Sequence, residues 1–297
     1  MSTGPQGQQL SQIAARYGLH PVGVRPRLGD YIRSIVRRRE FISVLATSKA
    51  QAQNQNTYLG QVWAILTPLL NSIVYVLIFG VMLRTRAGMD NVIGFIVVGT
   101  FMYGFFSSTV TASAKSITSN LKLVQSLQFP RAILPISVAV KELVVLIPGL
   151  LVMMVISQVA IGVVQGSELI HPERWPLLIP MVAFLFLFSS GVGMILARYA
   201  SHIPDITNTL PFVLRIGMYA SGVIFSIDRW VDHPTLQVIM TYQPVAVYLN
   251  LARQAVLAET NIPINWSMWA MGAGWAVALF IIGFLVFWKD EARYGRD

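Results

Sequence analysis

The sequence predicts an all-helical integral membrane protein that crosses the bilayer six times, and its composition gives the first two reasons. Of its 297 residues, 55% are hydrophobic and only 12% are charged, whereas about 25% of the residues in an ordinary soluble domain are charged. The mean hydropathy is +0.60. A soluble domain of this length needs a charged surface that this composition does not supply, so a lipid environment is the simpler explanation.

Six apolar stretches are the third reason, because each is close to the roughly 20 residues that a helix needs to cross about 30 Å of hydrocarbon. They cover residues 62–83, 92–114, 143–164, 176–197, 209–227 and 266–288. The third helix is expected to begin earlier, near Ala132, in the cytoplasm. The fifth stretch is short and is interrupted by glycine.

The chain therefore divides into four predicted regions. They are a flexible polar N-terminus (1–27), an amphipathic helix with a linker (28–61), the six-span domain (62–288) and a short tail (289–297). The first 61 residues contain no long apolar run, so no signal peptide is expected. The sequence has no cysteine, which excludes disulfides and thiolate chemistry.

The distribution of positive charge orients the predicted spans. Fifteen Lys and Arg residues lie in the N-terminal region, in loops 115–131 and 198–208 and in the tail, against five in the remaining loops. Positive residues accumulate on the cytoplasmic side of membrane proteins, so both termini are predicted to be cytoplasmic. The net charge of +9 has the same origin, and nucleic acid is not a predicted partner.

The segment before the first span has the pattern of an amphipathic helix over residues 28–46. One face carries Leu28, Ile32, Ile35, Val36, Ile42 and Leu45. Arg33, Arg37 and Arg38 lie elsewhere on the helix, where cations can contact anionic headgroups. We expect a helix in the membrane interface. A solvated helix packed on another subunit is the alternative, and both can hold.

Two segments between the spans have helical patterns of their own. Loop 115–131 carries apolar residues at helical spacing as far as Phe129-Pro130, and a residue before proline is biased out of the helical region. A short amphipathic cytoplasmic helix is therefore predicted, suited to docking a soluble partner. Segment 226–265 is too apolar for a solvated loop and too often broken by proline for a span, which predicts short surface-lying or re-entrant helices on the outer side.

Catalytic chemistry is poorly represented. No Gly-Lys-Ser/Thr occurs, so the chain lacks the phosphate-binding loop that ATP hydrolysis usually needs. The four histidines are scattered, and no metal site is expected. Asp228, Arg229, Asp232 and His233 form the one outer cluster that a membrane-embedded glycosyltransferase would need. A conduit is favoured over such an enzyme, and a structural scaffold is favoured less.

Charged residues inside spans are costly and often functional. Lys141 and Glu142 either neutralise neighbouring groups or mark the point at which the third helix enters the bilayer. Arg215 faces a polar interior or an anionic substrate, or else extends to the headgroups. Deep aromatic residues favour, as a set, an aromatic-lined passage for a saccharide, although ordinary helix packing accounts for each one singly.

Three groups of residues, on six spans in this order, carry a resemblance to a known family. The first is Tyr58-Leu59-Gly60 with Trp63, Leu66 and Pro68; the second is Phe129-Pro130-Arg131 with Pro135; the third is Ser221 to Phe225, then Gln243-Pro244 and Arg253. From about Arg27 onward the chain resembles the membrane subunits of ABC-2-type exporters of polysaccharides, the group with Wzm and the teichoic acid permeases. It most resembles the actinobacterial branch that exports lipid-linked galactan.

The sequence departs from the family's pattern in three places. Gln53 and Asn54 stand where the family often has a basic residue and a tyrosine, Pro204-Asp205 stands for Arg-Asp, and Gln243-Pro244 for Asn-Pro. These differences affect the residue-by-residue correspondence rather than the family.

The resemblance implies an ABC-2 (type V exporter) fold and a homodimer completed by two copies of a separate ATPase subunit, which binds ATP and magnesium. This chain itself would hold no cofactor and perform no catalysis. Its substrate would be a lipid-linked polysaccharide, moved through a channel between the protomers. An exporter of another amphiphile with the same fold is the nearest alternative.

The resemblance also implies roles for particular residues. Coupling to the ATPase falls to Lys115, Lys122, Phe129, Pro130 and Arg131, with His202 and Asp205 as a second contact. The channel would be lined by Trp63, Tyr75, Phe79, Phe212, Arg215 and Tyr219. The outer gate would contain Phe225, Trp230, Tyr242 and Pro244. The lipid diphosphate would meet Arg37, Arg38 and Arg39, for which a generic contact with anionic lipid is the alternative.

Overall fold

The computed structural model describes residues 26–53, 57–78, 91–165, 172–257 and 263–294. All regular secondary structure in these ranges is helical. The α-helices are α2 (Leu28–Arg37), α3 (Arg39–Ala52), α4 (Trp63–Tyr75), α5 (Val92–Ala114), α6 (Leu121–Ser126), α7 (Ile133–Gln165), α8 (Leu178–His202), α9 (Asp205–Ala220), α10 (Ile227–Trp230), α11 (Pro234–Tyr242), α12 (Pro244–Val256) and α13 (Trp266–Lys289). The predicted all-helical class is confirmed.

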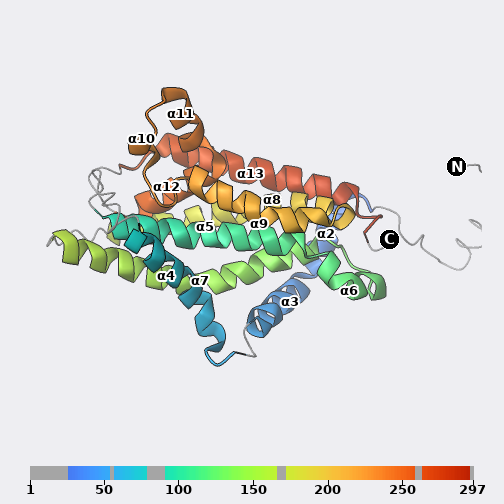
Figure 1. Cartoon of the computed structure of the whole chain (residues 1–297). Helices are drawn as coiled ribbons and strands as arrows, with labels where there is room; N and C mark the ends of the chain where they lie inside the picture. The colour runs from blue at the N-terminus through green and yellow to red at the C-terminus, as the bar shows by residue number, and fades with distance from the viewer. Residues whose placement is uncertain (1–25, 54–56, 79–90, 166–171, 258–262, 295–297) are drawn as a thin grey trace, which may run out of the picture.

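The long helices lie side by side in one bundle (Figure 1). Helix α6 and the C-terminal end of α13 lie at one end, which we call the α6 end. Helices α10 and α11 lie toward the opposite end, which we call the α11 end. Four helices in the described ranges are long and apolar enough to cross a membrane: α5, α7, α8 with the turn before it, and α13.

The other two predicted spans are not described as helices of full spanning length. Helix α4 and the turn after it form an apolar helix over Trp63–Ile78, and the rest of that predicted span lies outside the described residues. Helix α9 has 16 residues, about 24 Å at 1.5 Å per residue. The described helices therefore confirm four of the six predicted spans by length.

The fifth span was predicted at 209–227, but α9 begins at Asp205 and ends at Ala220. Gly222 has a φ of +66°, a left-handed conformation that glycine adopts without steric cost. The chain turns there and resumes as α10. Apolar composition alone did not indicate this early end, because the turn residues 221–227 are themselves mostly apolar or small.

Helix α5 is the centre of the bundle, and most of its side chains are buried. It contacts α4, α7, α8, α9 and α12. The Asn91 side chain starts the helix by accepting a hydrogen bond from the Gly94 amide at 2.7 Å, which satisfies one of the unpaired N–H groups of the first turn. The Asn91 amide group donates to the Ser157 carbonyl at 2.9 Å, so the same residue ties α5 to α7.

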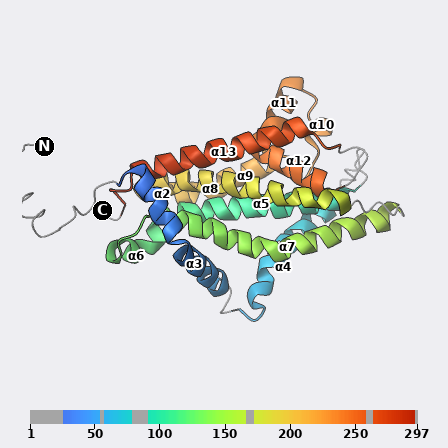
Figure 2. The ribbon, with the colours of Figure 1, turned by 180° about the vertical axis from the view of Figure 1, so that it is seen from behind.

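Helices α8 and α13 pack very closely, through glycine on both sides. A Cβ atom added at Gly283 would lie 2.2 Å from the Gly191 carbonyl oxygen, and one added at Gly191 would lie 2.3 Å from the Leu279 carbonyl oxygen. Small residues permit such backbone contact between helices in membranes. Helix α7, in contrast, contains Pro148 and is visibly bent in Figures 1 and 2, as expected where proline removes a helical hydrogen bond.

The amphipathic segment forms two helices rather than the single one predicted over 28–46. The break is at Arg38, whose φ and ψ are −98° and 24°. Tyr31, which is outside the predicted apolar face, is the buried residue of α2 at 1% exposure, whereas Val36 is 63% exposed. The break at Arg38 and the burial of Tyr31 have the same cause. The α2–α3 pair packs against the α6 end of the bundle instead of lying on one flat surface.

Short helices also form in both predicted inter-span segments. Loop 115–131 contains one turn of 3-10 helix and then α6. The outer segment contains α10, α11 and α12. Helix α12 is the exception to a surface position, because nearly all of its residues from Ala246 onward are buried. Irregular backbone at membrane depth is tolerated when it is buried in protein in this way.

Candidate functional site

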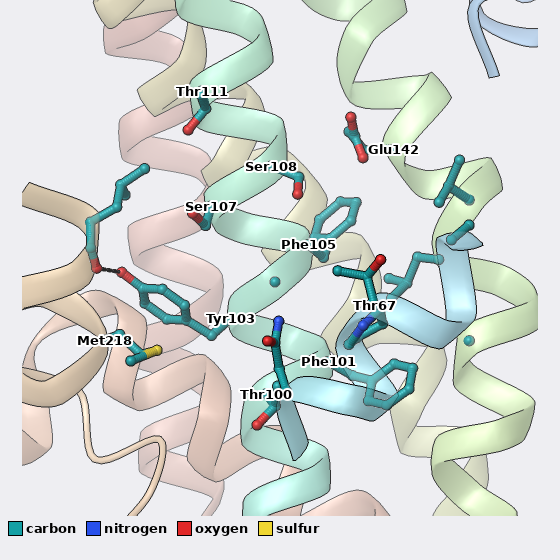
Figure 3. A pocket seen from close by; sticks show the side chains of 18 of the residues that line it. Thr67, Thr100, Phe101, Tyr103, Phe105, Ser107, Ser108, Thr111, Glu142 and Met218 are labelled. Atoms are coloured by element: carbon teal, nitrogen blue, oxygen red, sulfur yellow. Dashed lines mark hydrogen bonds between the residues drawn. The ribbon is translucent and has the colours of Figure 1, made fainter. Parts of the chain in front are cut away.

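A cavity of about 510 Å³ lies between α4, α5, α7 and α9 (Figure 3). Its α5 wall carries the hydroxyl groups of Thr100, Ser107, Ser108 and Thr111. These residues follow helical spacing, so they share one face of α5. Thr100 and Thr111 are separated by about 16 Å along the helix axis. The polar wall therefore extends through much of the half of the bundle nearer the α6 end.

The other helices complete the polar lining. Helix α4 contributes Thr67 and Asn71, and α7 contributes Glu142. The Tyr103 hydroxyl of α5 donates a hydrogen bond to the Leu214 carbonyl of α9, drawn as the dashed line in Figure 3. Glu142 is 7% exposed and lies 2.7 Å from the ammonium group of Lys141. The neighbouring lysine therefore compensates the charge of this carboxylate, as a buried charge requires.

The cavity brings together three of the six residues predicted to line a channel. Trp63 and Tyr75 of α4 and Arg215 of α9 lie in its wall. Phe212 and Tyr219 do not: they lie on the outward face of α9, 66% and 46% exposed. Phe79 lies outside the described residues.

The sequence prediction missed most of the polar wall, although a signal for it was present. Within the apolar stretch 92–114, Thr100, Gly104, Ser107 and Thr111 recur at intervals of four, three and four residues. That spacing marks one face of a helix. A polar stripe on an otherwise apolar span indicates a face directed toward protein interior or water rather than lipid.

The residues predicted to contact the ATPase differ in exposure. Lys115 and Lys122 are exposed on the turn before α6 and on α6 itself, and His202 and Asp205 are exposed at the end of α8 and the start of α9. Phe129 and Pro130 are buried. The Phe129 ring packs edge-on against Phe41 of α3 at 5.7 Å between centroids. Phe129 therefore supports the α6 segment from behind and does not offer its ring to a partner.

The arginines predicted for a lipid diphosphate lie at the junction of α2 and α3. Arg37 and Arg39 are exposed. Arg38 donates a hydrogen bond to the Gln128 carbonyl at 3.1 Å. Arg38 thus holds the chain between α6 and α7, a role that its position in the sequence did not indicate.

The predicted gate residues lie between α9 and α12. Phe225 is half-buried, Tyr242 is 47% exposed, and Pro244 opens α12. The Trp230 side chain lies outside the described structure. In the acidic and basic cluster weighed as an enzyme site, the Asp228 carboxylate accepts hydrogen bonds from Gln237 and Thr241. Asp228 therefore joins α10 to α11.

The comparison with protein families identifies the class of this protein. The model of the ABC-2 type transporter family matches residues 40–257, a region that begins in α3 and includes every helix around the cavity. The chain belongs to the ABC-2 type transporter family. It is therefore a transporter subunit and a multi-pass bacterial membrane protein, and its family implies an ATPase as partner.

Individual relatives of this ABC-2 chain support the same class. The O-antigen export system permease protein RfbA of Myxococcus xanthus is 26% identical over 84% of this chain and 92% of its own length. A protein of the same description from Klebsiella pneumoniae is 22% identical over 86% of this chain and 94% of its own length. The predicted likeness to polysaccharide-exporter permeases is confirmed at this level.

Toward the α11 end of this ABC-2 chain, the side chain that precedes α12 and one side chain of α12 hold the turn that follows α9. Gln243 donates to the Ala220 carbonyl at 2.5 Å, and Arg253 donates to the carbonyls of Gly222 at 2.8 Å and Val223 at 3.1 Å. Arg253 is 3% exposed, and its guanidinium carbon lies 3.3 Å from the centroid of the Phe95 ring. Helix α9 and α12 are thereby joined at one point.

At the α6 end, the C-terminal tail joins four elements. The Glu291 carboxylate accepts hydrogen bonds from the Tyr31 hydroxyl at 2.6 Å and from the Arg131 amide at 2.8 Å. The same Tyr31 hydroxyl accepts one from the Ala132 amide at 3.1 Å. Asp290 accepts one from the Arg198 side chain at 2.5 Å and lies 3.3 Å from His202. We call Tyr31, Arg131, Arg198, Asp290 and Glu291 the tail network.

The two carboxylates of the tail network have opposite pKa changes. Burial raises the pKa of Glu291 above its usual 4.5, and the hydrogen bonds from Arg131 and Tyr31 only partly oppose this. The pKa of Asp290 lies below its usual 3.8. Burial alone would raise it, but the hydrogen bond and charge of Arg198, together with His202 and Arg293, outweigh the effect of burial. Burial likewise raises the Tyr31 pKa well above 10, so its hydroxyl keeps its proton at neutral pH.

Glu291 is therefore expected to make stability fall as pH rises above about 4.5. A group whose pKa is raised by folding binds more protons in the folded state, so its contribution is complete at low pH and is lost as pH rises through the folded pKa. Thermal unfolding of the purified protein between pH 4 and 8 measures this. Relative to Glu291→Gln, the wild type should lose about 1.4 kcal/mol for each tenfold increase in the proton affinity of Glu291 on folding.

Glu40→Gln is the matched control, because Glu40 is an exposed carboxylate of α3. This variant should follow the wild-type pH profile. An identical profile for Glu291→Gln and the wild type would show that the Glu291 carboxylate is not desolvated as described.

Proposed function

We propose that this ABC-2 chain is the membrane subunit of an ATP-driven exporter that moves a lipid-linked polysaccharide from the cytoplasmic to the outer side of a bacterial plasma membrane. The observation that carries the proposal is the cavity between α4, α5, α7 and α9, in which one face of α5 carries a row of hydroxyl groups. The names of the relatives support it, since they describe O-antigen export permeases. Galactan, from the resemblance to the actinobacterial branch, is the polymer we propose.

The chemistry of the cavity suits a saccharide. Serine and threonine hydroxyls both donate and accept hydrogen bonds, as sugar hydroxyls do, and a row of them can exchange partners as a chain passes. Trp63 and Tyr75 line the same space, and an aromatic face packs well on the C–H face of a sugar ring. A purely apolar ligand would make no use of this row of hydroxyl groups in the wall.

Two lysines near the cavity are our candidates for the lipid diphosphate. Lys141 precedes the cavity residue Glu142 on α7. Lys49 lies on α3, and its pKa is lowered by burial and by the nearby charge of Lys141. Two ammonium groups, of which one is paired with the Glu142 carboxylate, leave a net positive charge, which an anion stabilises. The pair lies closer to the cavity residues in sequence than Arg37, Arg38 and Arg39, and Arg38 is already engaged.

The remaining parts of the proposal concern assembly. The α6 end faces the cytoplasm. There, Lys115 and Lys122 of each protomer in a homodimer dock one of two copies of an ATPase that binds ATP and magnesium. A second copy of this chain completes the channel. The exposed aromatic residues of α9, Phe212 and Tyr219, then face either the second copy or lipid.

Filling the cavity is expected to stop export without unfolding the protein. Gly104 lines the cavity, and a Cβ atom added there meets no atom within 4 Å. Gly104→Phe therefore places a ring in open space. In the native host, we expect polymer to accumulate on the cytoplasmic side to the level seen on depletion of the protein. The ATPase subunit should still co-purify in equimolar amount.

Gly274→Phe is the matched control, because Gly274 of α13 also has open space around its Cβ position but is exposed and remote from the cavity lining. It should export normally. Normal export by Gly104→Phe would exclude this cavity as the path. Failure of any ATPase to co-purify with the folded wild type would contradict the exporter itself.

A further inference from the structure

We propose that the C-terminal pair Asp290-Glu291 positions the α6 segment, and that export requires it because it transmits movement of α6 to the transmembrane helices. The proposal rests on the function proposed above, since it needs an ATPase partner that acts at the α6 end. It assigns a task in that function to two residues that lie outside the region matched by the ABC-2 family model, which ends at residue 257.

The first step is the cap on α7. The Arg131 and Ala132 amides belong to the turn that leads into α7, and the first N–H groups of a helix have no partner within the helix. Glu291 and Tyr31, respectively, supply the acceptors. A negative charge at this position is also favoured by the helix dipole. The N-terminus of the longest helix is therefore held by a carboxylate that is 160 residues away in the sequence.

The second step is the link to α8 and α13. Asp290 is the residue that ends α13, and it lies next to Glu291. Its carboxylate binds Arg198, near the end of α8. The Asp290 side chain is 9% exposed and the Arg198 side chain is 25% exposed. Salt screens a partly buried ion pair less than an exposed one. The pair thus joins the ends of α8 and α13 to the cap on α7.

The third step is the support behind α6. The Leu127 backbone leaves the helix in an extended conformation, with φ −122° and ψ 140°, so α6 itself is joined to α7 by non-helical chain. Such a link would absorb a displacement unless it were fixed. Arg38 holds the Gln128 carbonyl, Phe41 packs on Phe129, and Glu291 holds Arg131.

These contacts leave α6 exposed on its outward side, with Lys122 and Leu127 accessible, while the chain behind it is fixed. A force applied to α6 therefore reaches α7 through the tail network. It reaches α8 and α13 through Asp290 at the same time. Without the carboxylates, the same force would be taken up by the extended link.

The test uses the full complex, with its ATPase subunit, in proteoliposomes supplied with lipid-linked polysaccharide. The variants are Glu291→Gln, which keeps the shape but removes the charge, and Tyr31→Phe, which removes only the hydroxyl. We expect both to retain the ATPase subunit and ATP hydrolysis. The amount of polymer exported per ATP hydrolysed should fall at least about fivefold. This factor is the lower end of the range that is typical of coupling between two sites. Hydrogen exchange at the Arg131 and Ala132 amides should accelerate.

The ratio of export to ATP hydrolysis separates positioning from a merely structural role, which would lower both together. Glu40→Gln, an exposed carboxylate on α3, should leave the ratio unchanged. If Glu291→Gln does not fold, Tyr31→Phe decides, because it retains the carboxylate. An unchanged ratio, or loss of the ATPase subunit from the variants, would overturn the inference. Absence of export by the wild type would instead contradict the proposed function.

Discussion

Gly283→Ala is expected to prevent α13 from packing on α8. The added Cβ would lie 2.2 Å from the Gly191 carbonyl oxygen, and this neighbour is backbone, which cannot rotate away as a side chain can. The two helices would have to separate along the largest helix contact in the bundle. We expect a loss of stability at or above about 3 kcal/mol, the upper end for overpacking, and strongly reduced yield of folded protein.

Thermal unfolding in detergent measures this effect, with Gly274→Ala as control in the same helix. A Cβ at Gly274 meets no atom within 4 Å, so that variant should match or slightly exceed wild-type stability, since alanine favours helix over glycine. Equal midpoints for the two variants would mean that α8 and α13 do not approach as closely as described.

Arg253→Met is expected to be the second severe change. It removes the guanidinium donors from the Gly222 and Val223 carbonyls in a site from which water is largely excluded. Each buried carbonyl without a donor costs about 1–3 kcal/mol, so we expect a loss of about 2–6 kcal/mol. Because these carbonyls form the turn after α9, the variant should also loosen the α11 end of that helix.

Two measurements distinguish the local effect from general unfolding. Thermal unfolding should show the loss of stability. Relative to the wild type, hydrogen exchange should accelerate most at residues 217–226. Arg293→Met is the matched control, since the Arg293 side chain is 73% exposed and its Asp290 partner is 4.0 Å away. Wild-type exchange around Gly222 in Arg253→Met would show that α12 does not hold this turn.

The apolar stretches of the sequence were sufficient to predict the four long helices, because lipid-facing and core-facing residues are both apolar and hydropathy does not need to distinguish them. The same property concealed the early end of α9. Gly222, Val223 and Ile224 are buried and as apolar as a span, and only the φ of Gly222 makes them a turn. A backbone dihedral of one residue is not visible in a hydropathy pattern.

The candidate site was predicted only in part, for a related reason. Trp63, Tyr75 and Arg215 were conspicuous as large or charged residues, whereas the polar face that α5 gives the cavity is made of small hydroxyl side chains such as Ser107 and Thr111. Such residues are common in membrane helices for packing, so only their shared face distinguishes them. The contacts of Glu291 with Tyr31 and Arg131 join residues 260 and 160 positions apart, and no local pattern encodes such pairs.

The cap on α7 has a consequence for the order in which the protein is made. Ribosomes synthesise the chain from its N-terminus, so Tyr31 and Arg131 leave the ribosome long before Glu291 is synthesised. Through most of translation, the first turn of α7 must find its acceptors in water. The contacts behind α6 are complete only when α13 and Glu291 have been synthesised. An ATPase that docks at the α6 end would therefore encounter a finished site only on chains whose synthesis has passed Glu291.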